Sequence, residues 1–450
     1  MGRDEPREAD LTGPATRQAA AERELDRRIA RLALPALGSI AAEPLYNLAD
    51  TAIVGHLGRE QLDSLAIASS ALSVAAWLAV FLTTATTTAV ARRTAQRDDE
   101  AAGRTVGAAY LVAAAWGVVT AVVIVIVAPW LAELLGAHQQ VLAGATGYLR
   151  LSAIGLPFLY LSFAGNGHLV GLADTRTPLV IAVAANAVNV GLELLLVFGV
   201  HLGLFGSALG TVIAQVAAAA WYATASWHKA SFRPRKPRRQ EMRELLADGH
   251  RISVRTVALG VVPLATTAVV ARLGPVALGG QQIAYRLWYL LSLSLDAFAV
   301  PAQVFISAAL GAGDHEAARL AGRRTLWLGL AAGVALGLVT AALAVGAPAL
   351  FTNDPAVRSV AVTGLLTSAA TQPLAALAFV LDGLVLGLGD YAAMRRVMIL
   401  AIAAFAPMAA LVLRFHWLGL PGVWAAIGLW LAARAALLGR RWAVATVRSD

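Results

Sequence analysis

The sequence predicts an all-α polytopic membrane protein with 12 transmembrane helices, arranged as two pseudo-symmetric lobes of six helices each. Three observations predict this class. Apolar runs of ~20 residues, the length needed to cross a hydrocarbon core of ~30 Å, recur along almost the whole chain. Only 14% of the 450 residues are charged, and the mean hydropathy is +0.68. The chain also repeats itself at one fixed offset.

The apolar runs give the order of the elements. Those of 28 residues or more exceed the bilayer thickness, so we expect some helices to tilt or to extend beyond it. The 12 expected spans lie near residues 33–55, 65–90, 106–134, 145–172, 178–199, 203–226, 252–273, 280–310, 325–349, 358–387, 395–414 and 419–440.

The positive charges orient these spans. The net charge of +9 does not indicate nucleic-acid binding, because the basic residues lie between apolar runs, where they act as a topology signal. Most of the 36 Lys and Arg residues fall on the side that holds both chain ends, which we therefore expect to be cytoplasmic. Arg255 lies inside a span. The opposite side holds Arg59, Arg150, Arg272, Arg286, Arg358 and Arg414.

The same patterns divide the chain and suggest its location. No secretory signal precedes the first span. With 34 Arg, 2 Lys and no Cys, the composition favours a GC-rich bacterial source, and we expect a multi-pass protein of the bacterial inner (plasma) membrane. The expected parts are an N-terminal tail (1–30), a first lobe (31–227), a basic cytoplasmic linker (228–250), a second lobe (251–442) and a C-terminal tail (443–450).

The internal repeat is the most informative feature, because five separate matches share an offset of 216 residues. Each half holds six spans, an even number, so both halves enter the membrane from the same face. Transporters built from parallel repeats have this arrangement. The matched segments are Thr51–Gly58 with Thr267–Gly274, Asp98–Ala102 with Asp314–Ala318, Pro157 with Pro373, Gly167–Asp174 with Gly383–Asp390, and Gly203–Gly206 with Gly419–Gly422.

The chain has no phosphate-binding loop, so an ion gradient is the expected energy source. Ionisable residues at bilayer depth are costly and point to function. In the first span, Glu43 and Asp50 are seven residues apart and share a helix face with Asn47. Pro35 and Pro44 each remove a backbone hydrogen bond, so this helix can bend. The alternative is that the prolines fix a static bend.

Further polar residues of the first half lie at a related depth. At ~1.5 Å per residue, Asp50 and Glu193 lie ~28 and ~24 Å from the cytoplasmic side. Asn189 is one turn from Glu193, and Thr211 lies nearby, whereas Asn166 lies closer to the midplane. We expect Asp50, Glu193 and Asn47 to bind the coupling ion, and Glu43, Tyr46, Asn166, Asn189 and Thr211 to line the substrate cavity. Buried acids that are only structural are the alternative.

The second half is chemically different, because Asp50 corresponds to Thr266 and Glu193 to Ala409. We assign Asp296 and Asp382 to the substrate cavity, but either could be structural, and Asp382 is expected to form an ion pair with Arg255. His168 is expected to be a hydrogen-bonded structural residue. No pattern indicates a metal or acyl-transfer site, so we predict no metal and no catalytic residue.

The sequence resembles the multidrug and toxic compound extrusion (MATE) transporters, in particular their DinF-like branch. The resemblance covers the chain from about residue 28. It rests on Leu34-Pro35, Pro44–Gly58, Ala91–Arg93, Gly165–Gly167, Asn189–Glu193, Gly203–Thr211, Gln372-Pro373 and Asp382-Gly383.

This resemblance implies a V-shaped pair of lobes and the export of amphipathic, often cationic, compounds. It also implies that Asp50 couples cation movement to substrate release, and that Asn166, Asn189, Glu193 and Thr211 line the same cavity. The family motif often has Asp where this chain has Glu193, which leaves the coupling ion open.

We therefore predict a secondary active multidrug efflux antiporter that is proton-coupled, operates by alternating access and is not an enzyme. Sodium coupling is the alternative for the ion. A major-facilitator-type transporter, a lipid flippase and, in a different class, a membrane-embedded enzyme are the alternatives for the protein. The expected partners are small organic substrates, the coupling cation and the lipid bilayer, with no cofactor and no nucleic acid. We expect a monomer.

Overall fold

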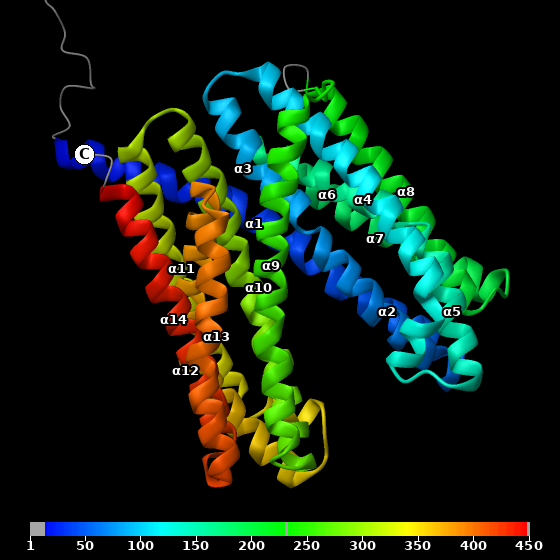
Figure 1. The fold of residues 1–450 in the computed structure, drawn as a ribbon. Helices are drawn as coiled ribbons and strands as arrows, with labels where there is room; N and C mark the ends of the chain where they lie inside the picture. The colour runs from blue at the N-terminus through cyan, green and yellow to red at the C-terminus, as the bar shows by residue number, and fades with distance from the viewer. Residues whose placement is uncertain (1–13, 230–232, 448–450) are drawn as a thin grey trace, which may run out of the picture.

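The computed structural model describes residues 14–229 and 233–447, and it is almost entirely helical (Figure 1). The elements of the first half are α1 (Pro14–Gly55), α2 (Arg59–Ala79), α3 (Phe81–Ala95), α4 (Asp99–Leu134), α5 (Gln139–Ala153), α6 (Leu156–Gly171), α7 (Arg176–Leu194) with a short π-helical turn η2 (Leu195–Gly199), and α8 (Leu204–His228). Those of the second half are α9 (Arg239–Ala271), α10 (Pro275–Gly311), α11 (His315–Leu343), η4 (Ala347–Leu350), α12 (Pro355–Leu388), α13 (Tyr391–Arg414), η5 (His416–Leu418) and α14 (Gly419–Val447).

The helices agree with the predicted class. Within the described residues, 10 helices are long and apolar enough to cross a membrane, or up to 11 if the bent pair α5–α6 counts as one span. That pair bends by 48°, and α2 and α3 together form a single candidate span. The remaining predicted span lies in α1, which is not among these candidates. Its sequence carries Glu43, Asn47 and Asp50 within one stretch, and these polar residues lower its hydropathy.

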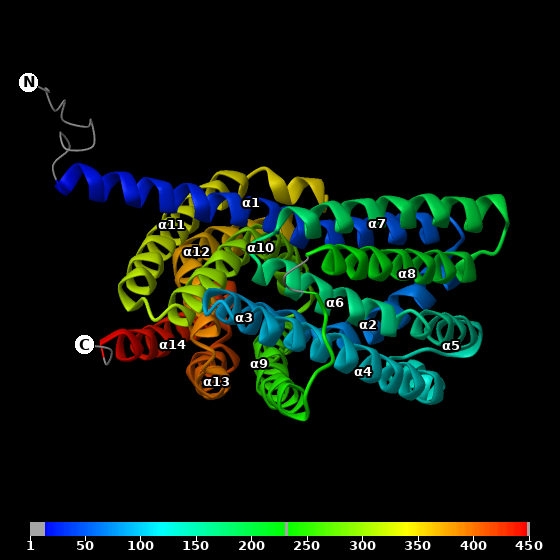
Figure 2. The ribbon, with the colours of Figure 1, turned by 90° about the horizontal axis from the view of Figure 1, so that it is seen from above.

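The helices form two lobes, α1–α8 and α9–α14, which lie together at one end and diverge toward the other (Figures 1 and 2). The end where they meet holds the α3–α4 turn and the start of α9. Hydrogen bonds join the lobes there: the Gln303 amide donates to Thr84 O at 2.8 Å, and Arg92 donates to Leu388 O at 2.9 Å. We call this end the closed end. It is the end that the charge distribution predicts to be cytoplasmic.

The structure contains the predicted repeat in its close contacts. A Cβ on Gly117 would meet the Pro157 backbone, and one on Gly333 would meet that of Pro373, 216 residues later. In the same way Gly167 lies against the Thr83 carbonyl and Gly383 against that of Ala299. Left-handed backbone recurs at the same offset, in the pairs Gly58 and Gly274, Arg97 and Gly313, Ala173 and Gly389, and Gly203 and Gly419.

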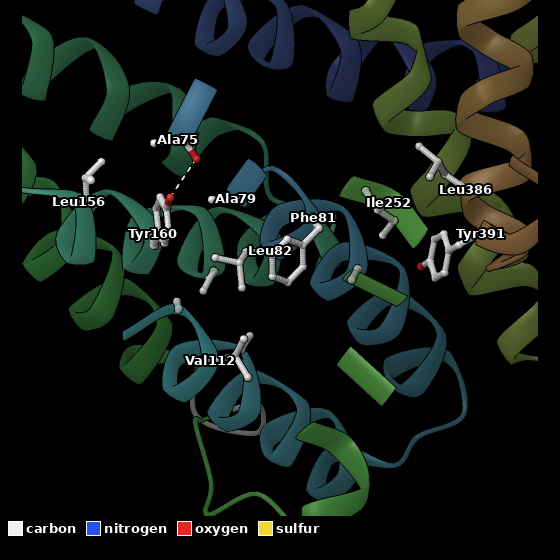
Figure 3. Close-up of a cluster of buried hydrophobic side chains, with 14 of the residues drawn as sticks. Ala75, Ala79, Phe81, Leu82, Val112, Leu156, Tyr160, Ile252, Leu386 and Tyr391 are labelled. Carbon is white, nitrogen blue, oxygen red and sulfur yellow. Dashed lines mark hydrogen bonds between the residues drawn. The ribbon is translucent and has the colours of Figure 1, made fainter. Parts of the chain in front are cut away.

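Small residues dominate the interior, which allows helix axes to approach closely. A large buried cluster extends across both lobes and includes Leu82 and Leu156 of the first and Ile252 and Leu386 of the second (Figure 3). Tyr160 is fully buried there, and its hydroxyl donates to Ala75 O at 2.9 Å, which satisfies a polar atom that would otherwise lack a partner (Figure 3).

The N-terminal segment differs from the expectation of a tail over residues 1–30. Helix α1 begins at Pro14, so the first span continues backward into that segment. Ile29 is fully buried, and Glu22 and Asp26 form ion pairs with α11 of the second lobe. Charged residues on this stretch made it resemble a solvated tail, but the partners of Glu22 and Asp26 are on the other half of the chain. Residues 1–13 lie outside the described residues.

Candidate functional site: a buried acid pair in the first lobe

Two carboxyl groups meet inside the first lobe. Asp50 on α1 is 7% exposed, and Glu193 on α7 is completely buried. Ser207 on α8 donates to Asp50 Oδ1 at 2.7 Å, and Tyr46 on α1 donates to Glu193 Oε1 at 2.5 Å. The two acids lie close enough to interact electrostatically. Three helices of one lobe thus contribute to a single acidic group.

The local sequence explains how these side chains meet. Tyr46 and Asp50 are four residues apart and therefore lie on one face of α1. The Tyr46 hydroxyl also lies 2.9 Å from Thr211 Oγ1 on α8, and Asn189, one turn before Glu193, donates to the same oxygen at 3.4 Å. Gly210 allows α7 and α8 to approach, because a Cβ there would lie 3.3 Å from Glu193 Cγ.

The acid pair retains unused acceptor capacity. Glu193 Oε2 and Asn189 Oδ1 are buried without a hydrogen-bond partner among the described residues. Buried polar atoms are nearly always paired with protein, water or an ion. These two oxygens can therefore accept from a proton carried by a neighbouring group, from water or from a small cation.

Three of the predicted residues lie outside this group. Glu43 and Asn47 are exposed, although they lie on the same helix as Asp50. The position that we expected Asn47 to occupy is taken by Tyr46, whose longer side chain reaches α7. Asn166 on α6 is partly buried, and its side chain has no hydrogen bond to Asp50 or Glu193 among the described residues. The roles assigned to these residues stay predictions.

Helix α1 continues through both of its prolines. Pro44 leaves the Ile40 carbonyl without its helical donor. Near that point, Asn186 on α7 donates to the carbonyl of Ala42 at 3.0 Å. The outer half of α1 is thereby fastened to α7 on both sides of Pro44, and a bending role for Pro35 and Pro44 stays a prediction.

The second lobe holds a charge cluster instead of an acid pair. Arg255 donates to Asp382 Oδ2 at 2.9 Å, as the sequence led us to expect. Arg434 on α14 donates to the same oxygen at 2.5 Å and is completely buried. Its guanidinium stacks over Trp430 at 4.7 Å, a favourable cation–π arrangement. Asp296 on α10 is partly buried and within electrostatic range of this cluster.

Sequence reasoning missed two residues of these sites. Ser207 gave no signal, because a serine in an Ala/Gly-rich helix is common. Arg434 stands alone in an apolar stretch, but it lies six residues before Arg440 and was counted with the cytoplasmic charges. The structure corrects that assignment, since Arg434 is the buried counter-charge of Asp382.

His168 differs from its expected role as a hydrogen-bonded structural residue. It is completely buried, and neither ring nitrogen has a hydrogen-bond partner among the described residues. Arg286 on α10 is exposed. In the parts of the chain that the structure describes, no group of three or more His, Asp or Glu side chains is placed to hold a metal ion.

Comparison with known proteins gives matches over nearly the whole chain. A family model described as MatE matches residues 35–220 and 252–413. Protein DETOXIFICATION 44, chloroplastic, of Arabidopsis thaliana is 30% identical over 433 residues, covering 93% of this chain and 82% of that protein. The DNA damage-inducible protein F of Escherichia coli K12 is 27% identical over 434 residues, covering 93% and 92%.

Solved structures of the same fold also match. The bent form of the Vibrio cholerae MATE transporter VcmN superposes with a TM-score of 0.89 at 17% identity, over 96% of this chain and 99% of that one. A MATE protein in an outward-facing conformation gives a TM-score of 0.87 at 20% identity, over 94% and 96%. At these identities the structures establish the fold.

Proposed function

Because the chain belongs to the MatE family, whose members are transporters and not enzymes, we propose that it exports amphipathic or cationic organic compounds by proton antiport. The family assignment removes the major-facilitator and membrane-enzyme alternatives. The observation that carries the proposal is the buried pair of Asp50 and Glu193, which is bonded through Tyr46, Ser207 and Thr211 to three helices.

The pair has the properties that coupling requires. Removal from water favours the neutral form of a carboxyl group, and two acids in one site are unfavourable when both are ionised. A proton arriving from the open end of the lobes neutralises the pair and weakens its attraction for a cationic substrate. The same proton changes the hydrogen bonds that α1 makes with α7 and α8. A ligand that interacts differently with two states shifts their equilibrium.

The test is transport in liposomes that contain the purified protein and carry only a pH gradient. Asp50→Asn keeps the shape of the side chain but cannot cycle a proton, so proton-driven efflux of a dye such as ethidium is expected to stop. Glu43→Gln is the comparison variant: Glu43 is an acid of the same helix outside the buried group, predicted to line the substrate cavity, and its loss is expected to reduce efflux less than that of Asp50. Undiminished efflux by Asp50→Asn would remove this residue from the mechanism.

Sodium is the second candidate ion. The unpartnered oxygens Glu193 Oε2 and Asn189 Oδ1, together with the Asp50 carboxylate, form the kind of oxygen ligand set that suits a hard cation. Separate proton and sodium gradients distinguish the two ions. Efflux that follows only an imposed sodium gradient would reject proton coupling and retain the acid pair as a cation site.

We place the protein in a bacterial inner membrane with both termini and the linker in the cytoplasm, acting as a monomer, although plant relatives such as DETOXIFICATION 44 are named as chloroplastic. Reporter fusions at each terminus test this orientation. Expression in a pump-deficient host tests the substrate class, since accumulation of organic cations is expected to fall. Unchanged accumulation of a broad set of compounds, with the protein present in the membrane, would reject multidrug efflux.

A further inference from the structure

The first helix of each lobe extends onto the other lobe at the closed end. Helix α1 belongs to the first lobe, yet its N-terminal part crosses α11 of the second (Figure 2). Helix α9 opens the second lobe, yet its first turns contact α4 of the first. By the offset of 216, α1 corresponds to α9 and α4 to α11. The two contacts are therefore pseudo-symmetric mates.

Acids on the arriving helix and an arginine on the receiving helix hold the first contact. Arg324 on α11 donates to Glu22 Oε2 at 3.0 Å and forms two hydrogen bonds with Asp26, one of them at 2.9 Å. The side chains of Arg324, Glu22 and Asp26 are 23%, 21% and 25% exposed. A bidentate arginine–carboxylate pair of this kind is more directional than a single contact. We call this set the α1 clasp.

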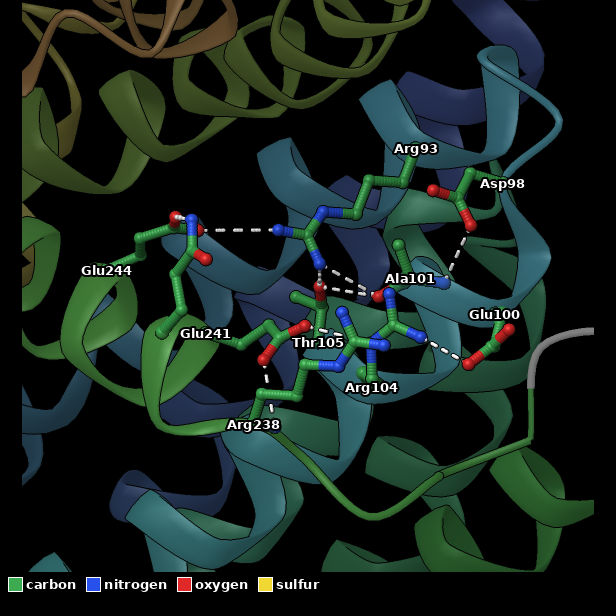
Figure 4. Close-up of polar contacts among 10 residues, drawn as sticks. Arg93, Asp98, Glu100, Ala101, Arg104, Thr105, Arg238, Glu241 and Glu244 are labelled. Carbon is green, nitrogen blue, oxygen red and sulfur yellow. Dashed lines mark hydrogen bonds and ion pairs between the residues drawn. The ribbon is translucent and has the colours of Figure 1, made fainter.

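The mate also pairs acids of the arriving helix with arginines of the other lobe, here one on α4 and one on α3 (Figure 4). Arg104 on α4 donates to Glu241 Oε1 at 2.9 Å, and Arg93 on α3 donates to Glu244 Oε2 at 3.4 Å. Although burial acts to raise the pKa of Glu241, the hydrogen bonds that it accepts from Arg104 and from backbone N–H groups, together with the charge of Arg104, lower that pKa, so the carboxylate is ionised at neutral pH. We call Arg104, Glu241, Arg93 and Glu244 the α9 clasp.

The segment that leads into the α9 clasp is held against α4, where two glycines make room for it. Residues 233–238 run along α4, where Arg235 N donates to Gly103 O at 2.9 Å. A side chain at Gly103 or Gly107 would collide with the backbone of Arg233 or Arg235. This part of the linker is thus fixed to the first lobe. The backbone N–H of Arg238 then donates to Glu241 Oε2 at 2.8 Å. The start of α9 is therefore attached to the first lobe, while its remainder belongs to the second.

From this reciprocal exchange we propose that the α1 and α9 clasps together hold the closed end shut, and that Arg324 and Arg104 are positioning residues that set how often this end opens. The inference rests on the alternating-access transport proposed above. Opening this end requires the lobes to separate, and both clasps cross that boundary. Because α1 also carries Tyr46 and Asp50, the α1 clasp connects the acid pair mechanically to the closed end.

The test measures opening directly by the distance between spin labels. The chain contains no cysteine, so labels at Arg176→Cys on α7 and Arg396→Cys on α13 are specific. Both positions are exposed and lie outside the clasps. Partly exposed ion pairs contribute up to ~1 kcal/mol, equivalent to a roughly five-fold population change. Arg324→Gln and Arg104→Gln are each expected to raise the long-distance population about two- to five-fold, and the double variant by the product of the two.

Two controls separate a specific clasp from loss of charge or of folding. Arg28→Gln removes a charge from the same part of α1, but among the residues that the structure describes Arg28 pairs only within its own helix, with Glu24 at 3.2 Å, and no shift is expected. Arg324→Lys keeps a positive charge beside Glu22 and Asp26 and is expected to stay closer to the wild-type distances than Arg324→Gln. Unchanged distances in a monodisperse double variant would overturn the inference. The labels report opening without transport, so absent efflux with the predicted shifts would count against the proposed function alone.

Discussion

Replacing Tyr46 by Phe tests whether one hydroxyl joins the acid pair to α1. The ring is kept, so packing changes little, and only the hydroxyl is lost. That hydroxyl donates to Glu193 at 2.5 Å and lies 2.9 Å from Thr211. A hydrogen bond to an ionised group contributes ~1.5–3 kcal/mol and one between neutral groups ~1 kcal/mol. We expect Tyr46→Phe to lower the free energy of unfolding by about 2–4 kcal/mol if Glu193 is ionised.

The matched comparison is Tyr110→Phe. Tyr110 is also partly buried in the first lobe, but its hydroxyl contacts a neutral partner, Ser226 Oγ, at 3.0 Å. Its loss is expected to cost about 1 kcal/mol. Denaturant titration in mixed micelles gives the loss of unfolding free energy for each variant. Repeating the titration at several pH values shows at which pH the two losses differ. The separation should grow as the pH rises, because the Tyr46 bond strengthens when Glu193 loses its proton.

Equal losses of unfolding free energy for the two variants at every pH would refute this reasoning, because the hydrogen bond from Tyr46 would then be no stronger than one between neutral groups. Transport supplies an independent reading. With α1 detached from Glu193, proton-driven efflux by Tyr46→Phe is expected to fall while Tyr110→Phe retains it. Retained efflux by both variants would mean that the acid pair acts without this link.

Three further predictions concern the frame around the site. Ala173 has φ 60°, a conformation that favours glycine, and its repeat mate is glycine, so Ala173→Gly should stabilise the protein by about 0.5–1 kcal/mol. Gly313 has φ 74°, so Gly313→Ala should destabilise the protein. Melting temperatures check both changes. Although burial acts to raise the pKa of Asp174, hydrogen bonds from Thr177 and Lys229 lower it. Asp174→Asn should therefore reduce the free energy of unfolding at neutral pH, and this difference from the wild type should disappear as the pH falls below ~3.9. Asp382→Leu should cost about 3–5 kcal/mol in denaturant titration, because it removes the counter-charge of buried Arg434, and Arg434→Met in the same chain should recover part of this.

The fold could be predicted because its signals survive in a single sequence. Apolar runs report the spans, and the 216-residue offset places the lobes side by side. The depth of the acid pair followed from the rise per residue, since Asp50 and Glu193 were expected at similar levels and the structure brings them together. A family motif and simple helix geometry were sufficient for this part.

The remaining details depend on which neighbour packs at each level. Helix geometry placed Asn47 beside Asp50 but could not show that α7 lies within reach of Tyr46 instead. The start of α1 resembled a solvated tail because its acids find their partner, Arg324, about 300 residues away. Arg434 was hidden by the nearby Arg440 and Arg441, with which it was counted. Such long-range pairings leave no local pattern in the sequence.

One contact of the repeat also constrains how the two halves could have diverged. In the first half Gly144 lies against Ser64, whereas in the second half Gly280, the mate of Ser64, lies against Val360, the mate of Gly144. The larger side chain is therefore on a different helix in each half, and the space between the two helices is filled in both. A Cβ added opposite either occupant would lie 2.6 Å from it, so each contact has room for one side chain facing one glycine. The two halves meet the same steric requirement with the side chain on opposite helices.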